Sequence, residues 1–182
     1  MKPVFILLTG LSGSGKTTLG KGLTNYYSSR ENKVFHLDGD DLRKALHYDL
    51  GFSKEDRHKQ LMLTAELSIS YLKKGISVIV SLIAPYNDHR LDAKKLIENE
   101  GFDFKLIYVD CSIEGCIERD PKGLYKKVLK GEIKNFTGID DPYEPPKKAD
   151  FHIQTEKVNY QNSLKKMIEH SFIKTENLKN YK

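Results

Sequence analysis

A glycine-rich segment near the N-terminus contains the residues best suited to chemistry in this 182-residue chain. Residues 10–17 (GLSGSGKT) fit the pattern G-x-x-x-x-G-K-S/T, which follows a buried strand and opens a helix in phosphate-binding loops. Its glycines let backbone N–H groups turn inward and form an anion-binding nest, and the helix dipole favours the same anion. Lys16 is suited to reach the β- and γ-phosphates, and the Thr17 hydroxyl to hold Mg²⁺. The segment therefore predicts a nucleoside triphosphate site.

Acidic residues follow the second apolar run of the chain, and an arginine lies one turn further along. The acidic residues are Asp38, Asp40 and Asp41, and the arginine is Arg43. A carboxylate here can accept a proton from an attacking hydroxyl or bind Mg²⁺ through water. Arg43 suits bidentate contact with an anionic substrate. The structural alternative is that Asp38 or Asp40 is the N-cap of a helix. Both interpretations can hold at once, with one aspartate as the cap and another in the chemistry.

A third group of residues stands at the start of a predicted long helix. Ser53 fits an N-cap, and Asp56 three residues later completes an approximate capping box. Capping leaves Phe52 and Arg57 unexplained. An exposed aromatic ring beside an arginine suits a grip on a base and a phosphate, but a core phenylalanine and a surface arginine fit the sequence equally well. Residues 81–86 end the third apolar run and offer backbone groups to the same region.

Apolar β-branched runs alternate with longer amphipathic stretches, as in β-α-β units around a parallel sheet. The predicted strands are residues 4–8, 33–37, 76–81, 104–110 and 151–154. The predicted helices are residues 16–29, 54–74, about 85–99, 113–119 and about 160–172. Open α/β sheets bind ligands at the carboxyl ends of their strands, so we expect the groups described above to meet at one edge.

Residues 120–147 break this alternation with prolines, glycines and lysines. A long irregular insertion in a compact α/β domain is usually functional or disordered. The aromatic residues Tyr125, Phe136 and Tyr143 argue against disorder. We interpret the insertion as a substrate-covering lid within a single domain spanning residues 1–182.

Charge and composition limit the partners that fit this chain. The net charge is +5, and a basic surface suits either nucleic acid or small polyanions. The lysines are spread without an aromatic-interleaved stripe, which favours small-molecule substrates over nucleic acid. The longest apolar runs are too short to cross a bilayer, so we expect no membrane contact and a cytoplasmic location. Cys111 and Cys116 fit neither a zinc site nor a disulfide framework.

Taken together, these motifs resemble the adenylyl-sulfate kinase (APS kinase) family over about residues 4–155. The most specific segment runs from RDPKGLYKK at residues 119–127 to GEIKNFTGIDDPYEPP at residues 131–146. The phosphate loop, DGDDLR at residues 38–43 and DLGFSKEDR at residues 49–57 match in order. Members transfer the γ-phosphoryl group of ATP to the ribose 3′-hydroxyl of adenosine 5′-phosphosulfate.

The resemblance implies a P-loop NTPase fold of the α/β class. This fold is a three-layer α/β/α sandwich with a mainly parallel five-stranded sheet and a lid insertion at about residues 120–147. The resemblance also implies ATP as co-substrate, Mg²⁺ as cofactor, nucleotide substrates and a homodimer.

Roles for single residues follow from the same resemblance. Asp40 matches the family's base or metal-organising carboxylate, while Arg43 and Arg57 match the arginines that hold the 5′ anionic group. Phe52 and Phe136 match the pair that sandwiches the base. The predicted catalytic residues are Lys16, Asp40 and Lys122, where Lys122 neutralises charge on the transferred group. The predicted ATP-binding residues are Gly10, Ser12, Gly13, Ser14, Gly15, Lys16, Thr17, Thr18 and Arg119. The predicted substrate-binding residues are Asp40, Arg43, Phe52, Arg57, Gln60, Ile83, Lys122 and Phe136. The predicted magnesium ligands are Thr17 and, through water, Asp40.

The chain departs from the family pattern on the acceptor side. Gln60 stands in place of an asparagine, Asn87 in place of an arginine, and Ala84 in place of a serine often labelled a phosphoserine intermediate. The missing serine favours direct in-line transfer. The substitutions favour a changed acceptor, and we expect cytidine 5′-diphosphoramidate, a substrate of capsule phosphoramidate biosynthesis, whose smaller base leaves room for Gln60.

Three alternatives remain beside this expectation. The first is adenylyl-sulfate kinase activity, which makes 3′-phosphoadenylyl sulfate in sulfate assimilation. The second is a nucleoside monophosphate kinase or a shikimate-kinase-like enzyme that shares the phosphate loop. The third is a non-catalytic ATP-binding regulatory module.

Overall fold

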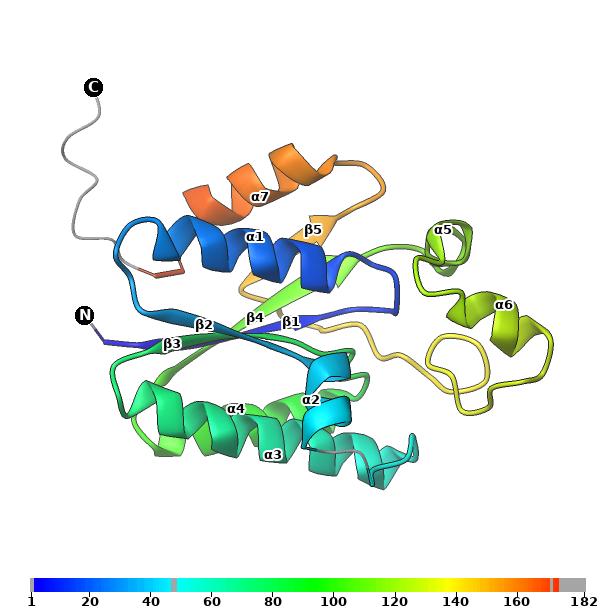
Figure 1. Ribbon diagram of the computed structural model, residues 1–182, viewed down its shortest axis with the longest axis horizontal. Coiled ribbons are helices and arrows are strands. Elements are labelled where there is room, and N and C mark those ends of the chain that lie inside the picture. Colours follow the sequence, from blue (N-terminus) through cyan, green and yellow to red (C-terminus); the bar gives the residue numbers. More distant parts are fainter. Residues whose placement is uncertain (1, 47–48, 171, 174–182) are drawn as a thin grey trace.

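The computed structural model describes residues 2–46, 49–170 and 172–173. Its centre is a five-stranded sheet with strand order β2-β3-β1-β4-β5, in which every pair of neighbouring strands is parallel (Figure 1). The strands are β1 (Val4–Thr9), β2 (Val34–Asp38), β3 (Ser77–Ser81), β4 (Asp103–Asp110) and β5 (Phe151–Gln154). The predicted α/β class with a parallel five-stranded sheet is confirmed.

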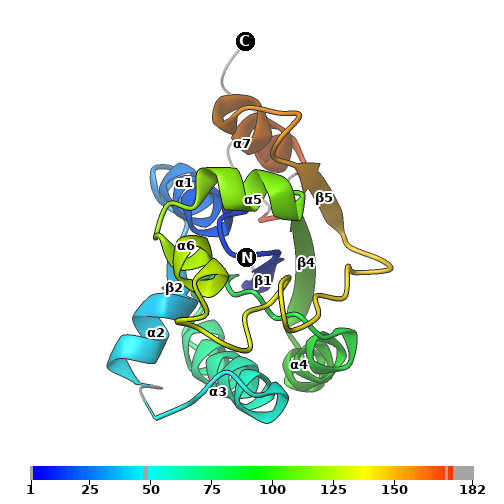
Figure 2. The same cartoon turned by 90° about the vertical axis from the view of Figure 1, so that its right-hand side faces the viewer.

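Helices cover both faces of the sheet and give the predicted three layers (Figure 1). One face carries α1 (Lys16–Ser28) and α7 (Tyr160–Glu169), and the other carries α3 (Lys54–Leu72) and α4 (Asn87–Asn99). Three shorter helices lie toward the carboxyl ends of the strands: α2 (Gly39–Ala45), α5 (Ile113–Arg119) and α6 (Leu124–Leu129). Figure 2 shows α5, α6 and the yellow segment after α6 in front of that end of the sheet.

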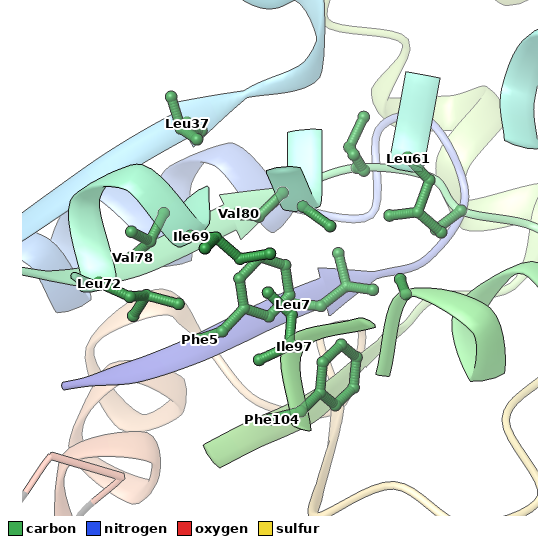
Figure 3. Packing of buried hydrophobic residues seen from close by; sticks show 14 of the residues in the cluster. Phe5, Leu7, Leu37, Leu61, Ile69, Leu72, Val78, Val80, Ile97 and Phe104 are labelled. Carbon is green, nitrogen blue, oxygen red and sulfur yellow. The ribbon is translucent and has the colours of Figure 1, made fainter. Parts of the chain in front are cut away.

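Strand β1 is buried on both faces, as expected for the central strand of a parallel sheet. Phe5 and Leu7 point to the α3 and α4 side, where they pack with residues such as Leu61 and Ile97 (Figure 3). Phe5 also stacks on Phe104 of β4, with ring centroids 5.3 Å apart. Each buried side chain of this kind contributes roughly 1.5–3 kcal/mol. The central strand is therefore fixed in the core, and it anchors the start of the phosphate loop that follows it.

The predicted helices and strands agree with the structure to within two residues, with one exception. The last helix ends at Glu169 rather than at residue 172. Phe172 and Ile173 are buried against the α1 side of the sheet, so the chain leaves the helix and turns back into the core. The last residue of the predicted helix, Phe172, therefore belongs to the packing that follows the helix.

The lid insertion contains a short helix that the sequence analysis did not predict. Helix α6 begins after Gly123, which has a positive φ of 66°. The Asp120 carboxylate accepts hydrogen bonds from the backbone N–H groups of Tyr125 and Lys126, 3.1 Å each. Tyr125 is buried beside the free thiols of Cys111 and Cys116. An aspartate ahead of apolar residues spaced three apart, Tyr125 and Val128, is the signal that predicts this helix.

In the described ranges, no helix is long and apolar enough to span a bilayer.

Candidate functional site

A cavity of about 800 Å³ opens at the carboxyl ends of the central strands. Its wall includes the phosphate loop, the start of α2, the first turns of α3, the turn after β3 and the connection from β5 to α7. Most of the predicted site residues line it: Ser12, Gly13, Ser14, Gly15, Lys16, Thr17, Thr18, Asp40, Arg43, Phe52, Arg57, Gln60, Ile83, Arg119 and Lys122. Gly10 and Phe136 are not among the lining residues.

The phosphate loop has the backbone conformation that its glycines predict. Gly13 and Gly15 have φ values of 78° and 103°, a region that favours glycine. A Cβ atom on Gly10 would lie 2.2 Å from the Val109 carbonyl oxygen, so a larger residue does not fit there. Gly15 caps α1 without a side-chain hydrogen bond, which leaves the first N–H groups of the helix to a ligand. This geometry is that of an anion site.

Lys16 lies inside this loop and is only 8% exposed. Its Nζ atom donates to the carbonyl oxygens of Gly10, at 2.9 Å, and Leu11, at 2.7 Å. Burial lowers the pKa of the amine to about 8. A polyphosphate in the cavity would supply the opposite charge that the buried ammonium group lacks.

The Thr17 hydroxyl donates a 2.6 Å hydrogen bond to Oδ2 of Asp38. The other carboxylate oxygen of Asp38 accepts from the backbone N–H of Asp40 at 3.0 Å, so Asp38 is also the N-cap of α2. The sequence analysis offered Asp38, Asp40 and Asp41 together as carboxylates for a proton or Mg²⁺, and it assigned the metal contact to Asp40. In the structure it is Asp38 that bonds the Thr17 hydroxyl while also capping α2.

Asp40 instead forms an ion pair with Lys122 of the lid. Both side chains are about half exposed. Asp40 comes from α2 and Lys122 from the segment before α6, so this contact joins the body of the protein to the lid. The structure thus brings together two of the three predicted catalytic residues.

Arg43 is fixed by neutral groups. Its Nη1 atom donates to the carbonyl oxygens of Leu50 and Gly51, and its Nη2 atom donates to Oε1 of Gln60 at 2.7 Å. The guanidinium lies over the Phe52 ring, 4.4 Å from its centroid. Burial lowers the pKa of this arginine, yet a guanidinium keeps its charge in proteins. Its charge is therefore available to an anion in the cavity.

Arg57 approaches the same phenylalanine and reaches the lid. Its Nε atom donates to the Phe52 carbonyl oxygen, and its Nη2 atom donates to the Asn135 carbonyl oxygen at 2.8 Å. Oδ2 of Asp141 lies 3.5 Å from Nε. The guanidinium is 5.6 Å from the Phe52 ring centroid. Phe52 itself is 51% exposed and lines the cavity, so the structure favours the ligand-facing interpretation of this residue over the core one.

Two predicted substrate contacts have different surroundings from those expected. Gln60 is buried, its Nε2 atom donates to the Gly39 carbonyl oxygen at 3.1 Å, and its Oε1 atom accepts from Arg43. Phe136 packs edge-on against Tyr125, with centroids 5.0 Å apart, in the cluster beneath the lid. The structure therefore does not bring Phe136 opposite Phe52 as a second face of a base sandwich.

Thr155 is a cavity residue that the sequence analysis missed. Its Oγ1 atom donates to the Ser14 carbonyl oxygen of the phosphate loop at 3.0 Å and accepts from Nη1 of Arg119 at 2.9 Å. Its carbonyl oxygen accepts from Nη2 of the same arginine. The only signal in the sequence is position, because Thr155 directly follows the last predicted strand at the edge where ligands bind.

Comparison with known proteins decides which family this site belongs to. The sequence profile described as adenylylsulphate kinase matches residues 2–154. The chain belongs to the adenylylsulphate kinase family. It is 42% identical to the adenylyl-sulfate kinase of Clostridium acetobutylicum over 169 residues, which cover 93% of this chain and 83% of that protein. It is also 42% identical to a probable adenylyl-sulfate kinase of Aeropyrum pernix, with 92% and 94% covered.

A solved structure of an adenylylsulphate kinase family member has the same fold. The APS kinase of Mycobacterium tuberculosis, in complex with AMPPNP and APS, matches with a TM-score of 0.89 and 35% identity. The match covers 93% of this chain and 97% of that one. Membership of this family makes ATP the expected co-substrate and confirms the P-loop kinase fold.

The expectation of cytidine 5′-diphosphoramidate as acceptor, with a role in capsule biosynthesis, is wrong. The relatives that match nearly the whole chain are adenylyl-sulfate kinases, and the matching Mycobacterium tuberculosis structure is a complex with APS. The physical basis of the expectation also fails. Gln60 was expected to reach the edge of a smaller base, but both ends of its amide group are engaged by Arg43 and Gly39.

Proposed function

We propose that this protein is an adenylyl-sulfate kinase, which transfers the γ-phosphoryl group of ATP to the 3′-hydroxyl of adenosine 5′-phosphosulfate. The observation that carries the proposal is the arrangement of charge in one cavity. Arg43 and Arg57 flank the exposed ring of Phe52 on the wall formed by α2 and α3. The phosphate loop lines the same cavity. One cavity therefore contains a binding site for a triphosphate and a second binding site for a base with an attached anion.

On the donor side, the free N–H groups at the start of α1 and the Lys16 ammonium bind the β- and γ-phosphates. The oxygen atoms of Thr17 and Asp38 suit Mg²⁺, a hard cation that takes few protein ligands when it is bound with phosphates. When bound, Mg²⁺ would neutralise charge on the phosphate oxygens. Arg119 and Thr155 line the cavity beyond the loop and support the rest of the donor nucleotide.

On the acceptor side, Phe52 offers a π-face on which an adenine ring stacks. Arg43 and Arg57 hold the 5′-phosphosulfate with charge-assisted hydrogen bonds, which are stronger than neutral ones. The groups that hydrogen-bond Arg43 are neutral, so its charge is not used in pairing with them and is available to an anion. These contacts orient the ribose toward the phosphate loop.

The transfer itself is a direct in-line displacement. The acceptor 3′-oxygen forms a bond to the γ-phosphorus, the bond from that phosphorus to the β,γ-bridging oxygen breaks, and ADP leaves. Asp40 takes the proton of the 3′-hydroxyl. Lys122, released from Asp40, neutralises charge on the transferred group. Ala84 has no hydroxyl, so the turn after β3 offers no serine for a phosphorylated intermediate at that position.

The test is the rate of ADP release from Mg·ATP with two acceptors. Adenosine 5′-phosphosulfate and AMP differ only in the sulfate, so their kcat/KM ratio isolates the grip by Arg43 and Arg57. We expect a preference of about 10²-fold for the phosphosulfate, because AMP lacks the sulfate and so loses the charge-assisted hydrogen bonds that the arginines make to that group. Equal turnover of AMP would make the protein a nucleoside monophosphate kinase. ATP binding without turnover of either would leave a non-catalytic ATP-binding module.

The homodimer implied by the family resemblance is part of this proposal. The expected mass in solution is twice the chain mass of 20.9 kDa. A mass equal to that of one chain would contradict it.

A further inference from the structure

Arg90, on α4, is a buried cation outside the cavity and outside every role assigned above. Its side chain is only 3% exposed. Nη1 donates to the Ala84 carbonyl oxygen, and Nη2 donates to Oδ1 of Asn87 and to the Glu144 carbonyl oxygen. In residues 2–46, 49–170 and 172–173, no ion pair involves Arg90. Burying a charge is costly unless its hydrogen-bonding groups are satisfied, so the hydrogen bonds of Arg90 to these neutral oxygens are needed to hold it there.

The first thing that Arg90 contacts is a strained residue. Ala84 has a φ of 43°, in the left-handed region that residues with a Cβ atom rarely adopt. Such a conformation persists only where surrounding contacts hold it. The Ala84 carbonyl oxygen accepts from Arg90 and from Oγ1 of Thr9, and the Thr9 hydroxyl also bonds the Ile83 carbonyl oxygen at 2.6 Å. Ile83, Ala84 and Pro85 form part of the cavity wall.

The second contact is the far end of the lid insertion. Glu144 accepts from Arg90 through its backbone oxygen at 2.6 Å, and its own N–H donates to the Pro85 carbonyl oxygen at 2.9 Å. Its carboxylate accepts from the backbone N–H of Asn87 at 2.8 Å. We call this closed set of contacts among Ala84, Asn87, Arg90 and Glu144 the Arg90 clasp. It ties the turn after β3 to the point where the lid returns to the sheet.

We propose that Arg90 is a positioning residue, which holds the cavity wall at residues 83–85 and the returning lid in the geometry that the acceptor requires. The donor side is independent of it. In the described part of the chain, the side-chain hydrogen bonds of Arg90 go to Ala84, Asn87 and Glu144, and none goes to the phosphate loop or to Thr155. Loss of the clasp therefore weakens acceptor binding and leaves ATP binding intact. The expected difference between acceptor binding and ATP binding rests on the proposed function, whereas the Arg90 clasp itself does not.

The test replaces Arg90 with lysine, which keeps the charge but has one nitrogen in place of the guanidinium fork. We expect the acceptor KM to rise about tenfold, which corresponds to about 1.4 kcal/mol, with the KM for ATP unchanged. Lys94→Met, an exposed change on the same helix, is the control and should alter neither constant. Hydrogen exchange at the amides of Asn87 and Glu144 is the second readout, and we expect about tenfold faster exchange in Arg90→Lys.

Rescue separates positioning from general stability. Glycine adopts the left-handed conformation without strain, so Ala84→Gly removes the need for the bond from Arg90. In Arg90→Lys, adding Ala84→Gly should lower the acceptor KM again and slow exchange at Glu144. Equal increases in both KM values, or unchanged exchange at Asn87 and Glu144, overturn the proposal. If the wild type does not turn over adenosine 5′-phosphosulfate, the proposed function fails, and the exchange data still decide on the clasp.

Discussion

Lys16 is a cavity residue whose pKa burial shifts strongly. Burial lowers its pKa to about 8 in the free protein, so the amine loses its proton as the pH rises through 8. Only the ammonium form attracts phosphate, and bound phosphates raise the pKa again. We expect kcat/KM for ATP to fall about tenfold per pH unit above pH 8, since this constant reports the free enzyme. Over the same range kcat should stay nearly constant.

Steady-state kinetics with ATP varied between pH 6.5 and 9.5 check this prediction. A kcat/KM that stays constant through pH 9 would mean that Lys16 keeps its proton without a ligand. A parallel fall of kcat and kcat/KM would mean that a group other than Lys16 titrates in the complex.

Asp40 pairs with the lid lysine, whereas the Thr17 hydroxyl bonds Asp38, so substitution of Asp40 should spare ATP binding. For Asp40→Asn we expect a loss of about 10²–10⁴-fold in kcat, the usual contribution of a general base. The Kd for ATP, measured by titration calorimetry, should change less than about threefold. Asp103→Asn, at the opposite edge of the sheet, is the matched control. A large loss of ATP affinity would instead assign Asp40 to the metal.

Gln60 is expected to act through Arg43, because its amide oxygen accepts directly from that guanidinium. Gln60→Met should raise the acceptor KM about tenfold, and it should add little in an Arg43→Met background because neighbours in one network are not additive. A double-mutant cycle on the acceptor kcat/KM measures this coupling. Fully additive effects would mean that Gln60 contacts the substrate on its own.

The site shows which residue roles the sequence can predict. Lys16, Thr17 and the glycines follow from one local motif whose geometry depends on neighbours in sequence. Asp38 and Asp40 are two residues apart, and only the fold decides which of them meets Thr17. Thr155 contacts the loop from 141 residues away in sequence, and no local pattern marks that contact.

At the scale of elements, the start of α3 determines where several acceptor-side residues lie. Ser53 caps this helix: its Oγ atom accepts from the N–H of Asp56 at 3.1 Å and donates to the Asp56 carboxylate at 2.8 Å. Ser53→Ala should destabilise the protein by about 1 kcal/mol. For a chain of this size that corresponds to a Tm lower by about 2–4 °C. Ser29→Ala, an exposed serine just after α1, should change Tm much less.

Differential scanning calorimetry of the two variants measures both Tm values and tests this prediction. A Tm for Ser53→Ala that matches the Ser29→Ala control would mean that Asp56 or water replaces the cap.

The elements themselves follow from the sequence because short strand-forming runs of four to eight residues between helical stretches have few other structures open to them. The capping alternatives at Asp38 and Ser53 are also confirmed. Helix α6 was missed because prolines and glycines on either side indicate irregular structure, which hides the local signal of the Asp120 carboxylate ahead of Tyr125 and Val128.

At the scale of the whole molecule, strand order brings the two halves of the site together. Strands β3 and β4 lie on either side of β1, so connections leave the sheet in opposite directions around the phosphate loop. Ligands bind at such a switch point in open α/β sheets. The α2 and α3 side then carries Arg43, Phe52 and Arg57, while the β5 to α7 connection carries Thr155. The topology thus separates an acceptor side from a donor side around a common centre.

Acceptor identity was the part of the account that the sequence predicted wrongly. The residues at positions 60 and 84 indicate a changed local environment. Whether that change alters the acceptor depends on which groups the two side chains contact in the fold, and the sequence does not show those contacts. In the structure Gln60 supports Arg43, and Ala84 belongs to the Arg90 clasp. Both substitutions therefore fit an intact adenylyl-sulfate site.

The most direct test of the central claim is the identity of the product formed from Mg·ATP and adenosine 5′-phosphosulfate. Phosphorus NMR of the reaction mixture distinguishes a 3′-phosphate ester from a phosphate added at the 5′ end. We predict ADP together with a nucleotide that carries a new 3′-phosphate and an intact 5′-phosphosulfate. Absence of a 3′-phosphate, or a new phosphate at the 5′ end, would contradict the account.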